Sequence, residues 1–100
     1  MSASKYRYDF SSDAPIEDIE ASLVLAMLGI EALHGEAQVQ LSASHCLDVE
    51  QRTCVIDAGD VVGRDLNRLF AGYLSREFGK DSFRVRPIND STPTAAVASR

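Results

Sequence analysis

The chain begins with an alternation of charged and aromatic residues. The aromatic residues are Tyr6, Tyr8 and Phe10, and the charged residues are Lys5, Arg7 and Asp9. Side chains of a β-strand point alternately to its two faces, so a period of two is typical of a strand that buries one face. The pattern predicts a half-buried strand over residues 5–10.

A longer stretch follows, in which apolar residues recur every three or four positions. They are Ile16, Ile19, Leu23, Met27 and Ile30. This spacing places them along one stripe of an α-helix. Pro15 suits the first helical position because its missing N–H would have no partner there, and Gly35 suits a left-handed helix end. The pattern predicts a helix from Pro15 to His34.

Residues 37–44 alternate again, with small or apolar residues separated by glutamines and serines. We interpret this segment as a second strand with one apolar and one polar face. Residues 48–51 then suit a hairpin connection, and residues 53–57 have the composition of a third strand. The hairpin joins these two strands as sequential neighbours.

The rest of the chain predicts one more helix and one more strand. Asp60 is a good N-cap for a helix that runs to Phe78, and Gly79 ends it. Residues 82–88 form the last predicted strand. Residues 89–100 are rich in Ser, Thr, Ala and Pro and have no period, so we expect a disordered tail. Residues 1–88 then constitute a single α+β domain.

The predicted order is β-α-β-β-α-β, which is the ferredoxin-like plan. It implies a four-stranded antiparallel sheet in the order 4-1-3-2, with both helices on one face. Many unrelated activities use this plan, so the fold class alone does not indicate a function.

The negative net charge of the chain makes some classes of binding partner unfavourable. The 100 residues carry 15 Asp and Glu against 10 Lys and Arg, a formal net charge of −5. Such a chain repels phosphate backbones and anionic lipids, so we expect no nucleic acid and no membrane partner. No apolar stretch approaches the ~20 residues that span a bilayer, and no targeting segment is recognisable. We therefore expect a cytoplasmic protein.

The metal-ligating residue types do not have the spacing of a metal site. They are His34, His45, Cys46, Asp48 and Cys54. Neighbours in a strand point to opposite faces, so His45 and Cys46 cannot bind one ion together. We expect no metal and no cofactor. Pairing His45 with Cys54 keeps the apolar residues of the hairpin on one face, and this register predicts two unlinked thiols.

No catalytic motif is present either. Ser42, Ser44, His45 and Asp48 lie too close along one segment to form a nucleophile, base and orienting residue. Gly59 and Gly63 lack the spacing and the lysine of a phosphate-binding loop. The sequence favours a non-enzymatic interaction or regulatory module.

Two surfaces are candidates for binding. Neighbouring first and last strands would gather four cations on the sheet face away from the helices: Lys5, Arg7, Arg84 and Arg86. That face suits a small anion or an acidic protein partner, unless Asp9 and Asp57 neutralise it. An anion-binding domain, or an enzyme with few sequence signals, is the alternative function.

The second surface lies on the predicted helix 15–34. A stripe opposite the core stripe spans about 60° at about 100° per residue. It consists of Ala21, Leu25, Leu28 and Ala32. A helix packed on a sheet buries only one stripe, so a partner must cover the other or it stays exposed. The leading hypothesis is a homodimer that associates through this stripe.

Overall fold

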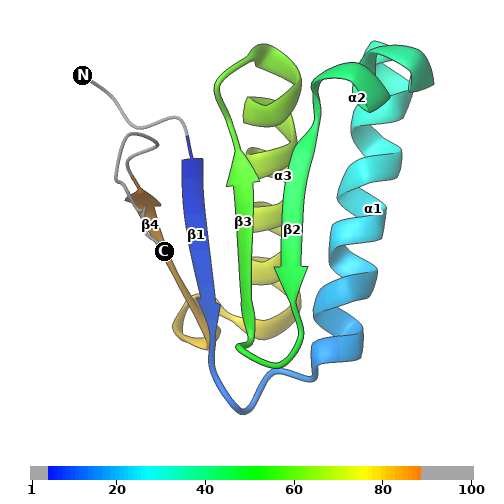
Figure 1. The fold of residues 1–100 in the computed structure, drawn as a ribbon. Helices are drawn as coiled ribbons and strands as arrows, with labels where there is room; N and C mark the ends of the chain where they lie inside the picture. Colours follow the sequence, from blue (N-terminus) through cyan, green and yellow to red (C-terminus); the bar gives the residue numbers. More distant parts are fainter. Residues whose placement is uncertain (1–4, 89–100) are drawn as a thin grey trace.

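The computed structural model describes residues 5–88, and the predicted tail, residues 89–100, lies outside them. The elements, drawn in Figure 1, are β1 (Lys5–Phe10), α1 (Ile16–His34), α2 (Glu36–Ser42), β2 (Ser44–Asp48), β3 (Thr53–Asp57), α3 (Val61–Phe78), the short 3₁₀ helix η1 (Lys80–Ser82) and β4 (Phe83–Ile88).

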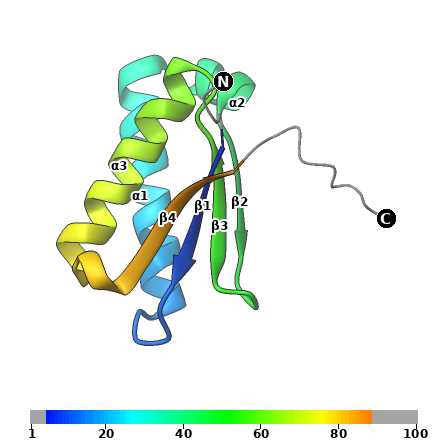
Figure 2. The ribbon, with the colours of Figure 1, turned by 90° about the vertical axis from the view of Figure 1, so that its left-hand side faces the viewer.

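The strands form a four-stranded antiparallel sheet in the order β2-β3-β1-β4. This is the predicted order 4-1-3-2 counted from the other edge, so the prediction of an antiparallel α+β fold is confirmed. Figure 2 shows α1 and α3 on one side of the sheet, and no helix within residues 5–88 covers the other side. The helices run in opposite directions and pack against each other along their length.

The prediction of a strand over residues 37–44 is wrong. Residues Glu36–Ser42 form the helix α2, so residues 5–88 contain three α-helices where two were predicted. Ala, Gln, Leu and Glu favour helix formation, and Gln38 donates a hydrogen bond to Ser42 one turn later, over 2.7 Å. Val39 alone of this helix is buried, and Leu41 is 84% exposed. The alternation over residues 37–44 is compatible with both a strand and a short helix.

The predicted register of the hairpin is also wrong, by two residues. Leu47 pairs with Cys54 and His45 pairs with Ile56, where the sequence predicted His45 opposite Cys54. The connection between β2 and β3 is residues 49–52 rather than 48–51. A shift of two residues keeps every side chain on its predicted face, so hydrophobic alternation cannot distinguish the two registers.

Aromatic side chains of β1 and α3 form the centre of the core. Tyr8 is 0% exposed, and its ring centroid lies 4.9 Å from that of Phe70 and 6.1 Å from that of Phe83. Its hydroxyl donates to Asn67 Oδ1 over 2.6 Å, which satisfies the buried polar group. Burial, above all other causes, raises the pKa of Tyr8 well above its usual range.

Arg52 ties the hairpin to the loop between β1 and α1. Its guanidinium donates to the backbone carbonyls of Ser11 and Ala14, and its own carbonyl accepts from the N–H of Phe10 over 3.0 Å. Arg52 has a φ of 57°, which places this last residue of the connection in the left-handed region. The hairpin is therefore held against the start of α1 by a half-buried cation.

The start of α3 is set by Asp60 and Gly63. Asp60 caps the helix as predicted, and its carboxylate accepts from the N–H of Gly63 over 2.9 Å. A Cβ on Gly63 would lie 2.0 Å from the backbone oxygen of Asp57. The end of β3 and the first turn of α3 approach this closely only because residue 63 has no side chain.

A pair of glycine substitutions in α3 tests this close approach. Gly63→Ala should lower the free energy of unfolding by about 3 kcal/mol, because the methyl group collides with backbone that cannot move aside. Gly72→Ala should raise it by ~0.5–1 kcal/mol, because position 72 has open space and alanine favours the helix. Urea denaturation at low protein concentration measures both, and equal effects would contradict the packing at Gly63.

Candidate functional site

The stripe predicted on the first helix lies on the solvent side of α1. Ala21 and Ala32 are exposed, and Leu25 and Leu28 are each 56% exposed. The opposite side of the same helix is buried in the core through Ile19, Leu23, Ala26 and Ile30. The structure therefore brings the four stripe residues together on a surface that no described element covers.

Val24 belongs to this surface as well, although the sequence reasoning omitted it. Its side chain is 52% exposed, and it lines a shallow hollow. The hollow is bounded by Glu17, Glu20, Ala21, Val24 and Leu25. We call Ala21, Val24, Leu25, Leu28 and Ala32 the outer face of α1. It contains three large apolar side chains, and the carboxylates of Glu17 and Glu20 border it at one end.

The four predicted cations also share one face. In the register of β1 and β4, Arg7 lies opposite Arg86 and Asp9 lies opposite Arg84. Lys5 lies two residues before Arg7 on β1, so it shares the same face of the sheet. These side chains alternate with Tyr8 and Phe10, which point into the core, so they lie on the open side of the sheet (Figure 2). We call Lys5, Arg7, Arg84 and Arg86 the basic sheet face.

Asp9 partly neutralises the basic sheet face. Its carboxylate oxygens lie 3.3 Å from Arg7 Nε and 3.8 Å from Arg86 Nε. Arg84 makes no ion pair within residues 5–88, and together with Asp9, Val85 and Arg86 it borders an open hollow. The face therefore keeps one unpaired arginine beside a carboxylate that already holds two others.

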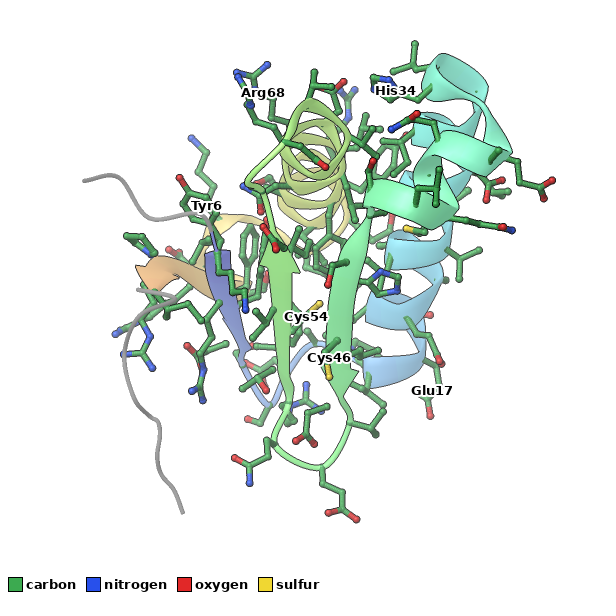
Figure 3. All side chains as sticks on the ribbon, turned by 45° about the horizontal axis from the view of Figure 1, so that its top comes forward. Tyr6, Glu17, His34, Cys46, Cys54 and Arg68 are labelled. Atoms are coloured by element: carbon green, nitrogen blue, oxygen red, sulfur yellow. The ribbon has the colours of Figure 1, made fainter. Side chains whose placement is uncertain are left out.

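The two cysteines lie on opposite faces of the sheet, as predicted, and both thiols are free. Cys46 is exposed and pairs with Val55, whereas Cys54 is buried and pairs with Leu47 (Figure 3). Burial, and to a smaller extent the neighbouring Cys46, raises the pKa of the Cys54 thiol to about 12. Such a thiol is a core residue rather than a nucleophile.

His34 has a role that the sequence did not reveal. Its Nε2 lies 2.9 Å from Asp65 Oδ2, so it joins the last turn of α1 to the second turn of α3. Within the described part of the chain, no group of three or more His, Cys, Asp or Glu side chains is placed to hold a metal ion. His34 contributes to the contact between two helices.

Comparison of the chain with models of protein families, with curated proteins and with solved structures found no match. None of the helices described within residues 5–88 is both long and apolar enough to cross a membrane. Because no relative indicates a function, the proposal for the candidate surfaces rests on their geometry and charge.

The two thiols should differ sharply in reactivity. In the native protein at pH 8, Cys46 should react fully with iodoacetamide while Cys54 reacts at least about 100-fold more slowly, because it is buried and its thiolate is scarce. Mass spectrometry of the intact protein should show one modification before unfolding and two after it. No modification at all, before or after unfolding without reductant, would indicate a disulfide between the two cysteines and contradict the strand register.

Proposed function

We propose that this protein is a small non-enzymatic interaction or regulatory module that self-associates through the outer face of α1. The observation that carries the proposal is the exposure of Val24, Leu25 and Leu28, each more than half accessible, directly opposite the core side of the helix. Contiguous apolar patches on the surface of a soluble domain mark interaction sites. A second copy is the partner that a two-fold contact supplies without any other component.

The size of the patch sets the expected strength. Burying three half-exposed side chains from each copy contributes about 1 kcal/mol per side chain, or roughly 6 kcal/mol in total. Association costs at least ~4 kcal/mol in lost translational and rotational freedom. The outer face of α1 by itself supports a weak dimer, and tighter association needs further contacts around it.

A second candidate function is the binding of a small anion or an acidic protein partner to the basic sheet face. The unpaired Arg84 beside an open hollow favours it. Asp9 opposes it, because an incoming anion must compete with this carboxylate for Arg86. Because of this competition, anion binding is the weaker of the two proposed functions.

Two finer expectations accompany the proposal. The order of β1, α1, β2, β3, α3 and β4 supports a ferredoxin-like plan in which α2 is an addition before β2. Two free thiols, one of them in the core, support a reducing compartment such as the cytoplasm.

Replacing the two central leucines tests self-association. The wild-type protein should sediment as a dimer at high micromolar concentration, and Leu25→Glu/Leu28→Glu should sediment as a folded monomer. Leu33→Glu/Leu41→Glu is the matched control, because these leucines are 70% and 84% exposed and lie off the outer face. It should remain dimeric. A monomeric wild type, or equal effects of the two double variants, would rule out the proposal.

Inorganic phosphate tests the second candidate. Titration of the wild type should shift the amide NMR signals of β1 and β4 with a dissociation constant in the millimolar range, typical of exposed charge pairs. Arg84→Gln should abolish the shifts. Arg76→Gln removes an exposed cation of α3 and should leave them unchanged. Shifts that persist in Arg84→Gln, or no shifts in the wild type, would exclude an anion site at this face.

A further inference from the structure

The two long helices carry opposite charges on their exposed sides. The charged residues of α1 are Glu17, Asp18, Glu20 and Glu31, and the chain has no lysine or arginine between Arg7 and Arg52. On α3, Arg64, Arg68 and Arg76 are exposed, and the two carboxylates of this helix lie off its outward side: Asp65 contacts His34, and Glu77 is near Leu66 on the helical wheel. Among the residues that the structure describes, none of these three arginines forms an ion pair. One surface of the helix layer therefore has an acidic half and a basic half.

The exposed side of α3 also has small residues that leave part of the helix backbone accessible. Arg64, Arg68 and Ser75 lie opposite the buried Leu66 on the helical wheel, and Gly72 lies beside them. A Cβ built on Gly72 meets nothing within 4 Å. Figure 3 shows Arg68 on the side of α3 away from the strands. Large apolar side chains of a partner can approach the backbone of α3 between these arginines.

We propose that a second copy of this chain seats its α3 on the outer face of α1, across a two-fold axis parallel to the helices. Two such contacts form at once, and the four long helices make a bundle of two facing layers between the two sheets. This inference rests on the proposed self-association and names the surface of the partner that takes part. It also supplies the further contacts that the outer face of α1 needs.

Symmetry fixes which residues meet. A two-fold rotation about an axis parallel to the helices leaves every residue at its own height along that axis. Within one chain, His34 is level with Asp65, and Gly29 is level with Leu69. Leu28 is therefore level with a position near residue 70 of α3, and Leu25 with a position near residue 73.

The residues at that height fit the leucines. At that height α3 carries the exposed Gly72 and two half-buried small residues, Ala71 and Ser75. The leucines of α1 thus oppose small side chains of the partner, as interdigitating helices require. By the same reckoning, Glu31 is level with a position near residue 67, between the partner's Arg64 and the partner's Arg68.

Packing α1 directly on the partner's α1 is less favourable. Face-to-face helices related by a two-fold axis perpendicular to them are antiparallel, and each flank lies beside the same flank of the partner. Glu17, Glu20 and Glu31 all lie on one flank of α1. With Leu25 opposite the partner's Leu28, Glu20 lies within about 3 Å, along the axis, of the partner's Glu31. The charges therefore favour α3 as the partner of α1.

Charge reversal distinguishes the two arrangements. Glu31→Lys and Arg68→Glu should each weaken the wild-type dimer roughly tenfold, because each places like charges at both contacts. An equimolar mixture of the two variants should restore the wild-type affinity in a heterodimer, since both of its contacts then join opposite charges. Glu50→Lys, in the turn between β2 and β3, is the control for Glu31→Lys and should neither weaken the dimer nor rescue Arg68→Glu when the two variants are mixed.

Analytical ultracentrifugation of the full chain gives the readout, and near-UV circular dichroism verifies that each variant is folded. Raising NaCl from 50 to 500 mM should weaken the wild-type dimer about threefold or more. A dimer that Leu25→Glu/Leu28→Glu abolishes but Arg68→Glu leaves intact, or that salt tightens, would overturn the role of α3 while leaving self-association in place. A wild type that is monomeric in both salts would overturn both proposals.

Discussion

The hydroxyl group of Tyr8 is held inside the protein, where it needs an acceptor, and that acceptor lies on α3. Its bond to Asn67 and the contact of its ring with Phe70 fix α3 over β1, one of the two inner strands. An unsatisfied buried hydroxyl costs about 1–3 kcal/mol, so this geometry is strongly preferred. With α3 placed there, α1 takes the remaining half of the same sheet face. The open sheet side and the outer side of α1 are what this arrangement leaves uncovered.

Most of the fold follows from local signals. The alternation in β1, the stripes of α1 and α3, the cap at Asp60 and the glycines that end both long helices are each a property of a few neighbouring residues. The errors arose where one pattern fits two structures. The alternation over residues 37–44 is also compatible with a short helix that buries Val39. A hairpin shifted by two residues keeps each side chain on the same face of the sheet.

The sequence predicts which residues share a candidate surface, because helical periodicity and strand alternation decide the face on which each side chain lies. Helical periodicity places Leu25 and Leu28 on one side of α1, and strand alternation places Arg7 and Arg86 on one side of the sheet. The partners of these side chains were not predictable in the same way. The sequence named Asp9 as a carboxylate that could neutralise this face, but its contacts with Arg7 on the same strand and Arg86 on β4 depend on side-chain distances. The role of Arg52 depends on a loop that reaches it from another part of the chain.

The helix layer and the basic sheet face would have different roles in a dimer. A two-fold contact through the helix layer is closed, because each copy uses its α1 and α3 once and adds no further copies. The sheets of such a dimer lie on its two outer sides, so the basic sheet faces point away from each other. A ligand with two acidic segments joined by a linker long enough to reach both faces would then bind with the gain of a second, intramolecular contact. Self-association would thus convert a weak, partly neutralised cationic face into a bivalent one.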